Sequence, residues 1–178
     1  MLWRLSHRAD QRWRVLADRH YNRQKIGSKQ FVPPGRCLVL YAQERDGQAF
    51  WITSYPFAEY VKHAWAGAWV CSAFRNENAG IASLLIRDAL AATRYVYGEP
   101  PSQGLVSFID KKKVKPTAVR GQKVWGWTWI KAGFTQVGET KGGLLAFQCP
   151  PARIPPARPM LIESHMLRYL PKNDHHQS

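Results

Sequence analysis

The sequence predicts an α/β fold: a mixed, mainly antiparallel, twisted sheet with helices on both faces. Three observations predict it. Short apolar runs are separated by polar turns, an Asp-Gly turn joins two of these runs, and one long Ala- and Leu-rich segment has the apolar spacing of a buried helix. The 178 residues fit one domain, and a hydrophobic content of 45% provides for a sizeable core.

The first segment predicts an amphipathic helix from about Ser6 to Tyr21. At 100° per residue, an apolar stripe and an arginine edge lie side by side. The stripe consists of Ala9, Trp13, Leu16 and His20, and the edge of Arg8, Arg12, Arg19 and Arg23. Such an edge suits phosphates, although a solvated helix face has the same pattern. His20 on the stripe fits a satisfied core histidine as well as a functional group.

Residues 36–42 and 48–54 predict two antiparallel strands, because Asp46-Gly47 between them is a strong hairpin signal. Residues 25–36 predict an irregular connection. Further strands are expected at 68–74, 105–109, 134–137 and 144–148, and helices at 79–95 and 124–132, the second closed by Gly133.

The composition changes at Cys149, because six prolines between 150 and 171 preclude much regular structure. We therefore divide the chain into a domain at 1–148 and a Pro-rich C-terminal extension at 149–178. The extension is expected to wrap the domain, with a short helix or strand at 161–170 and a disordered end at 172–178.

The charge balance points to a polyanionic partner. The net charge is +14, yet eight tryptophans and the apolar content exclude a disordered polycation such as a histone tail. A second basic run has no acid, and it consists of Lys111, Lys112, Lys113, Lys115, Arg120 and Lys123. A solvated loop is the alternative interpretation of this run.

Other patterns narrow the class of protein. The opening residues lack the apolar stretch of a signal peptide, so neither a signal peptide nor a membrane-spanning run is expected, and three distant cysteines predict neither a disulfide framework nor a zinc site. We therefore expect a soluble, cytoplasmic protein without a membrane partner. No His or Cys pair has metal-ligand spacing, so no metal is expected.

The most informative stretch is the junction between strand 68–74 and helix 79–95. Backbone N–H groups at such a small-residue helix start point outward with the positive end of the helix dipole behind them, which suits a pyrophosphate. Gly80 and Ala82 would let a phosphate approach the backbone, and Ser83 could add a hydroxyl donor. An ordinary glycine-containing helix start is the alternative.

This junction resembles the phosphate-binding signature of the GNAT superfamily of acyl-CoA-dependent acyltransferases, Gln/Arg-x-x-Gly-x-Gly/Ala. The matching residues are Glu77-Asn-Ala-Gly80-Ile-Ala82, and Glu77 departs from the pattern. A second block, Trp129-Ile-Lys-Ala-Gly-Phe134, looks like the late helix of the superfamily. The resemblance covers roughly residues 36–148.

The resemblance implies acetyl-CoA or another acyl-CoA as cofactor. Its pyrophosphate would lie on the amides of Asn78, Ala79, Gly80, Ile81, Ala82 and Ser83, and its pantetheine beside Ser72, Ala73, Phe74 and Arg75. Many members of the superfamily protonate the departing thiolate with a Tyr where this chain has Trp129. Tyr21, Ser107, Asp110 or water would have to replace it.

Within the superfamily, the chain is similar to the Mom-type DNA-modification proteins of bacteriophages. The likeness rests on His20-Tyr21, Phe74-Arg75, Ala82-Ser83 with Ile86-Arg87, and Asp110. It implies modification of the exocyclic amino group of adenine in double-stranded DNA, by Mom-like carbamoylmethylation. Asp110 or His20 would assist the weakly nucleophilic nitrogen, and Arg75 would place a cation at the phosphate seat.

An enzyme that reaches this nitrogen in a duplex is expected to extrude the base and stack it on an aromatic ring. Tyr21, Trp125, Trp127 and Trp129 are the candidates, with core packing as the alternative for each. Two other functions stay open: a GNAT N-acetyltransferase acting on an amine of a small molecule, aminoacyl-tRNA or protein, and a non-catalytic nucleic-acid-binding protein on a GNAT-like fold. The oligomeric state is open, a homodimer included.

Overall fold

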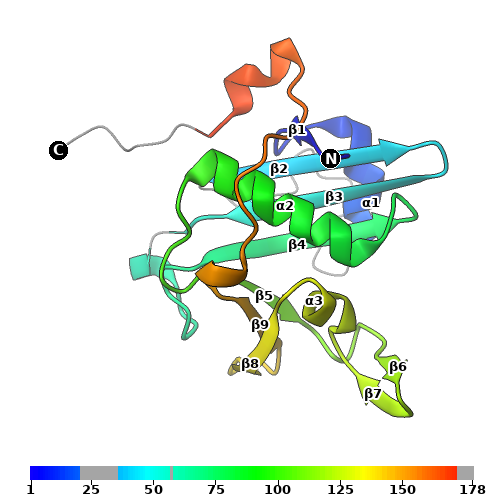
Figure 1. Cartoon of the computed structure of the whole chain (residues 1–178), viewed down its shortest axis with the longest axis vertical. Helices are drawn as coiled ribbons and strands as arrows, with labels where there is room; N and C mark the ends of the chain where they lie inside the picture. Colours follow the sequence, from blue (N-terminus) through cyan, green and yellow to red (C-terminus); the bar gives the residue numbers. More distant parts are fainter. Residues whose placement is uncertain (21–35, 57, 172–178) are drawn as a thin grey trace.

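The computed structural model describes residues 1–20, 36–56 and 58–171, without the side chains of Trp13 and Ala58. Seven strands form one sheet in the order β1-β2-β3-β4-β5-β9-β8, and each neighbouring pair is antiparallel except β4 and β5 (Figure 1). The strands are β1 (Arg4–Ser6), β2 (Cys37–Glu44), β3 (Gly47–Ser54), β4 (Trp69–Glu77), β5 (Leu105–Ile109), β8 (Thr135–Glu139) and β9 (Leu145–Cys149). The mixed, mainly antiparallel α/β architecture is therefore confirmed.

Helices pack on both faces of this sheet. On one face, α2 (Ala82–Tyr97) and α3 (Trp127–Lys131) share the larger core cluster with the sheet. On the other face, α1 (Arg14–Asp18) buries Leu16 and Ala17. The alternation of side chains along a strand explains the two clusters, since Leu38 and Leu40 of β2 face α2 whereas Val39 faces α1. Short 3-10 turns are η1 (Gln11–Trp13), η2 (Ala58–Tyr60), η3 (Pro151–Arg153) and η4 (Ser164–Tyr169).

The helix expected from Ser6 to Tyr21 is wrong in extent. Leu5 pairs with Leu40 as part of β1, and the Asp10 carboxylate accepts the Arg12 N–H and caps η1. The helical turn therefore begins only after Asp10, and α1 has five residues. As a result, the predicted arginine edge is not built on one helix. Tyr21 and Arg23 lie outside the described residues, as does most of the irregular connection expected at 25–36.

The predicted hairpin is present, with Glu44 paired to Gly47 across the Arg45-Asp46 turn. Gly47 is required there, because a Cβ at this position would lie 2.1 Å from the carbonyl carbon of Asn78. The tip of the hairpin thus packs directly against the turn that leads into α2. This contact fixes the end of β4 relative to the hairpin.

One hairpin, between residues 117 and 124, was not predicted. β6 (Thr117–Val119) and β7 (Gln122–Val124) form a two-stranded ribbon that projects from the rest of the molecule (Figure 1). Its turn residues, Arg120 and Gly121, have φ of 48° and 79°, which is the left-handed conformation of a tight hairpin turn. Part of the basic run, expected in a loop, therefore lies on a defined ribbon.

The C-terminal extension runs over α2 and pairs with β1 (Figure 1). Leu161 accepts a hydrogen bond from Leu5 N–H at 2.8 Å and donates one to the Trp3 carbonyl at 2.9 Å. Side chains of the extension are buried in the larger core cluster, namely Ile154, Met160 and Met166. The helix or strand expected at 161–170 is the 3-10 turn η4, and residues 172–178 lie outside the described residues.

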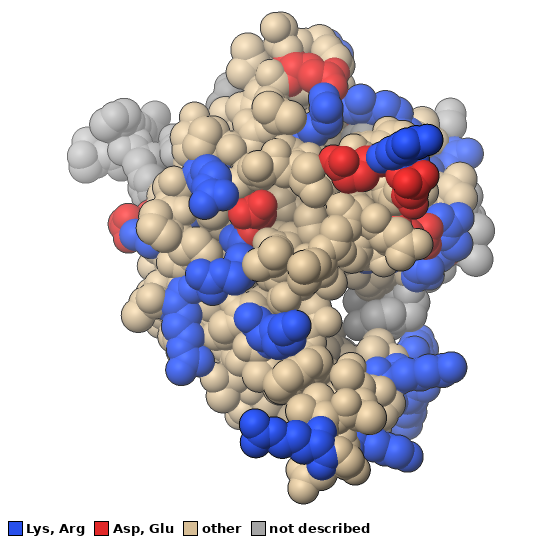
Figure 2. Space-filling model, turned by 45° about the vertical axis from the view of Figure 1, so that its right-hand side comes forward, with Lys and Arg blue, Asp and Glu red and all other residues tan. Residues whose placement is uncertain are grey.

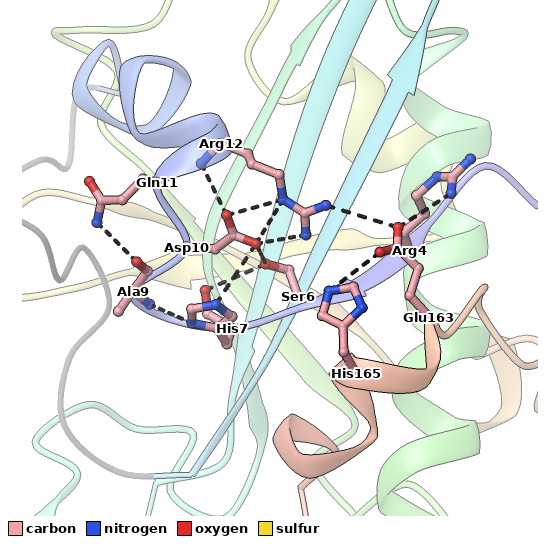
Figure 3. A network of polar contacts seen from close by, with 9 residues as sticks. All are labelled: Arg4, Ser6, His7, Ala9, Asp10, Gln11, Arg12, Glu163 and His165. Carbon is pink, nitrogen blue, oxygen red and sulfur yellow. Dashed lines mark hydrogen bonds and ion pairs between the residues drawn. The ribbon is translucent and has the colours of Figure 1, made fainter.

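Charged side chains also join the extension to the N-terminal segment (Figure 3). Glu163 lies 3.6 Å from Arg4 and 3.9 Å from Arg12, and Arg12 in turn donates to Asp10 at 2.7 Å. Asp10 is buried apart from 7% of its surface, so its carboxylate is desolvated and depends on these partners. The network fixes Arg12 in the fold.

Candidate active site between β4 and β5

The sheet opens between its two parallel strands. β4 pairs with β5 only from Trp69 to Cys71, whereas it stays paired with β3 as far as Asn76. β5 stays paired with β9 as far as Ile109. Because each strand follows its outer neighbour, the two diverge and leave a cavity of about 160 Å³. The cavity is lined by His20, Cys71, Ser72, Ala73, Phe74, Ser107, Phe108, Ile109, Val114 and Trp129.

A β-bulge shapes the β4 wall of the cavity. Ile52 opposes Ala73 and Thr53 opposes Cys71, so Ser72 is an extra residue in β4. A bulge takes backbone groups out of the regular ladder and reverses which face the following side chains occupy. Cys71 and Phe74 accordingly lie on the α2 face, and Ala73 packs on the α1 face. The cavity is therefore reached by side chains from both faces of the sheet.

His20 contributes a neutral imidazole to this cavity. It is buried apart from 8% of its surface, and its ring meets Phe50 edge to face at 5.9 Å. Burial lowers the pKa of His20 to about 4, and the charge of Arg75 lowers it further, while a hydrogen bond with the Phe74 backbone acts in the opposite direction. The imidazole is thus unprotonated at neutral pH and able to accept a proton.

Ser107 and Cys71 face each other where the strands part. They are paired in register, and a hydrogen bond joins their side chains. Burial raises the pKa of the Cys71 thiol, so it remains a thiol and is a poor nucleophile. Ser107 is 3% exposed, and its hydroxyl is a stronger hydrogen-bond donor than the Cys71 thiol. Trp129 closes the α2 side of the cavity and packs against Phe74 at 6.0 Å.

The turn between β4 and α2 is organised by one side chain. The Asn76 amide donates to the Gly80 carbonyl at 2.8 Å, and its oxygen accepts the Ala79 N–H at 3.0 Å. Ile81 is the N-cap residue and no side chain hydrogen-bonds to this helix end. The first amides of α2 therefore keep their capacity for an anion. Ser83, expected to add a hydroxyl donor, is buried.

Arg75 belongs to an ion-pair cluster with Glu77 and Arg19, a structural role that the sequence did not indicate. It donates to Glu77 at 2.6 Å and to the Arg19 carbonyl at 2.7 Å, and Arg19 forms an ion pair with the same carboxylate. The bond from Arg19 is the main cause that holds the pKa of Glu77 below its usual value. This cluster ties the segment after α1 to β4. Glu77, which departs from the signature, is thus neutralised by two arginines.

Several predicted site residues lie elsewhere. Asp110 caps a turn, because its carboxylate accepts the Lys112 N–H at 2.9 Å, and it is not among the described residues that line the cavity. Arg8 donates to the Cys37 sulfur at 3.4 Å. Lys111 lies 3.4 Å from Glu139, and Lys112 and Lys113 are exposed. The structure therefore brings His20 and Ser107 together at the cavity and leaves Asp110 outside its lining.

The tryptophans proposed as stacking surfaces differ in position. Trp129 is 9% exposed and packs against the core, and Trp125 also packs against the larger cluster. Core packing is thus the observed state of both. Sequence reasoning missed Cys71, Ile109 and Val114 in the cavity wall. The register of two predicted strands could have found Cys71, but Val114 depends on the fold of the turn after Asp110.

The described ranges contain neither a helix long and apolar enough to cross a membrane nor a group of three His, Cys, Asp or Glu arranged for a metal ion. Comparison of the chain with protein-family models, curated proteins and solved structures gives no match.

Proposed function

We propose that the protein is an acyl-CoA-dependent transferase with a GNAT-like fold that modifies DNA, with the exocyclic amino group of adenine as acceptor. The observation that carries the proposal is the cavity where β4 and β5 part, with the neutral imidazole of His20 in its wall. Strand β4 leads from this cavity to the start of α2, which no side chain caps. A thioester site and an anion site therefore lie along one strand.

The cofactor would bind along β4. Its pyrophosphate would accept hydrogen bonds from the amides of Gly80–Ser83, where the helix dipole favours negative charge, because the Ala79 N–H expected to join them already donates to Asn76. Its pantetheine would follow Ser72–Phe74, whose backbone leaves the ladder with β5 after Cys71. The thioester would then reach the cavity between the two strands. The backbone amides of the opened β4 segment are suited to stabilise an oxyanion.

The transfer step needs a proton acceptor and no metal ligand from this chain. The amino nitrogen attacks the thioester carbonyl carbon, the C–N bond forms, and the C–S bond breaks. His20 takes the proton that the nitrogen loses and passes it through water to the departing CoA thiolate, since Trp129 has no acidic group for this purpose. Ser107 lines the same cavity, where its hydroxyl would donate a hydrogen bond to the substrate.

The acceptor is proposed from the distribution of charge. Residues 111–134 contain seven Lys or Arg and no acid, and they follow β5 directly. In Figure 2 the acids on the visible face lie in its upper half, while the lower part, where the β6–β7 ribbon projects, shows Lys and Arg. A surface of this kind binds phosphates by releasing counterions.

A labelled-transfer assay tests the proposal. The purified protein is incubated with duplex DNA and acetyl-CoA carrying a radioactive acetyl group, and label in the recovered DNA is counted. The test variant is Ile81→Asp, which adds a carboxylate at the exposed N-cap of α2. Its matched control is Ile81→Asn, which caps the helix without the charge. We expect label with the wild type and with Ile81→Asn, and none with Ile81→Asp. Absence of label with the folded wild type would contradict the proposal.

A second candidate, an N-acetyltransferase acting on a small amine, is favoured by one observation. Arg12 and Arg19 form ion pairs with Asp10 and Glu77, so part of the expected arginine edge is already engaged. An acceptor without phosphates needs fewer free cations. The same assay with a panel of amines in place of DNA distinguishes the two functions.

A further inference from the structure

Three aromatic rings gather on the sheet face opposite α2. The centroids of His63 and Phe108 lie 4.9 Å apart, those of Trp65 and Phe108 5.8 Å, and those of His63 and Trp65 6.0 Å. His63 and Trp65 come from the connection between β3 and β4, and Phe108 from β5. We propose that this aromatic surface stacks against a base of the nucleic acid at the acceptor side of the cavity. The partner class rests on the proposed function.

Core packing does not account for these rings. All three residues are half-buried, and none is a member of either core cluster or of the side chains packed against one. The Trp65 ring lies over β8, where a Cβ added at Gly138 would be 3.7 Å from it. All five residues of β8 are exposed. Aromatic side chains that stay half-exposed on a polar surface are characteristic of binding sites.

The aromatic surface is continuous with the cavity. Phe108 belongs to both, because it lines the cavity and contacts the other two rings. On β5 its neighbour Ser107 faces Cys71 on the α2 side, so the alternation of side chains directs Phe108 to the opposite face. A base stacked on these rings would thus lie on the side of the cavity opposite Trp129.

Charge at this surface fits a nucleic acid. Lys111, Lys112 and Lys113 begin three residues after Phe108, and all three are exposed. Burial lowers the pKa of His63, so the ring is neutral and can stack without a charge of its own. Rings that stack bases beside cations that bind phosphates form the usual surface for an unpaired strand or an extruded base.

Oligonucleotide affinity without acyl-CoA tests the inference. Fluorescence anisotropy measures binding of a labelled oligodeoxyadenylate and of a strand of the same length that has sugars and phosphates but no bases. Trp65→Leu keeps an apolar side chain and loses the aromatic face, whereas Trp65→Phe keeps a ring. We expect Trp65→Leu to weaken binding of the oligodeoxyadenylate about 5- to 150-fold, to leave the abasic strand unchanged, and Trp65→Phe to lose much less.

Two controls make the result specific. Tyr95→Ala removes an aromatic ring that is 46% exposed on α2, and it should leave both affinities unchanged. Lys112→Ala with Lys113→Ala should weaken both strands equally. Equal binding of the oligodeoxyadenylate by wild type and Trp65→Leu, or equal losses on both strands, would overturn the inference. This binding assay contains no acyl-CoA and is therefore independent of transfer. If the protein binds the oligodeoxyadenylate in a base-dependent way but transfers no label to DNA in the assay above, the proposed function is contradicted and the inference is not.

Discussion

His20 is the side chain whose ionisation matters most for the proposed chemistry. Its place on an apolar stripe indicated a buried histidine, and the structure confirms the burial. The cavity beside it could not be predicted from that stripe, because it depends on where β4 and β5 cease to pair. Burial is a local property of the pattern, whereas the opening is set by the register of three strand pairs.

The lowered pKa of His20 gives a pH prediction. The folded-state pKa of about 4 is below the ordinary histidine value of 6.5, so protonation favours the unfolded chain. The free energy of unfolding that depends on a neutral His20 is fully present above pH 6.5 and is lost as the pH falls through 4. We expect the wild type to lose about 3 kcal/mol more unfolding free energy than His20→Gln between pH 7 and pH 4, measured by urea denaturation.

Parallel pH dependence of the two proteins would contradict this assignment. Carboxylates also take up protons as the pH falls, and the comparison with His20→Gln removes their shared contribution. The transfer rate gives an independent readout, since a base with a pKa of about 4 stays unprotonated down to pH 5. A rate that falls below pH 6.5 would indicate a solvent-exposed histidine instead.

At the scale of elements, the strands were predictable because they are short, apolar and bounded by turns. The strand at 105–109 and the hairpin at 37–54 are close to their predicted bounds. Two elements were not predictable in the same way. The apolar stripe that ends at His20 has helical spacing, but the strand pairing of Leu5 and the cap at Asp10 limit the length of the helix. The β6–β7 ribbon has few apolar residues and depends on its turn.

Asp10 should therefore stabilise the N-terminal segment. It caps η1 and accepts from the Arg12 guanidinium at 2.7 Å while almost fully buried. We expect Asp10→Ala to lower the free energy of unfolding by about 2–3 kcal/mol, since the cap is lost and Arg12 loses its bonds to this carboxylate. Asp10→Asn keeps the cap and should recover about half of this loss. No loss in Asp10→Ala, by urea denaturation, would refute the role.

The start of α2 gives a prediction in which stability and binding change in opposite directions. Ile81 is the N-cap residue, is 62% exposed and provides no capping side chain. Ile81→Asp should raise the unfolding free energy by about 1 kcal/mol through the cap. It should also weaken acetyl-CoA binding at least tenfold in calorimetry, because the carboxylate charge repels the pyrophosphate. Unchanged affinity would remove the anion site from α2.

The whole molecule combines a two-sided core with charge on its projections. A net charge of +14 was sufficient to indicate a polyanion, but not to show that Arg12, Arg19 and Arg75 serve ion pairs within the fold. Those pairings join segments distant in sequence and depend on the tertiary fold. The composition also indicated the extension after Cys149, and its buried methionines show how it adds to the core.

The salt dependence of DNA affinity follows from this distribution. Each phosphate contact contributes about 0.9 to the slope of log affinity against log salt. The combined change of Lys115, Arg120 and Lys123 to Ala should reduce the slope by about 2–3, if the ribbon contacts the backbone with all three. The control changes Arg158 and Arg168 to Ala, distant from the ribbon in the sequence, and should leave the slope unchanged. A DNA affinity that does not change with salt would show that these basic side chains do not bind the phosphates.

The central claim is that the cavity between β4 and β5 transfers a group from acyl-CoA to adenine in DNA. Mass spectrometry of nucleosides from cells that express the wild type or Ile81→Asp tests it most directly. The account predicts a deoxyadenosine of increased mass in the wild-type DNA, with the increment identifying the transferred group, and its absence with Ile81→Asp. Unmodified deoxyadenosine in cells that contain the folded wild-type protein would contradict it.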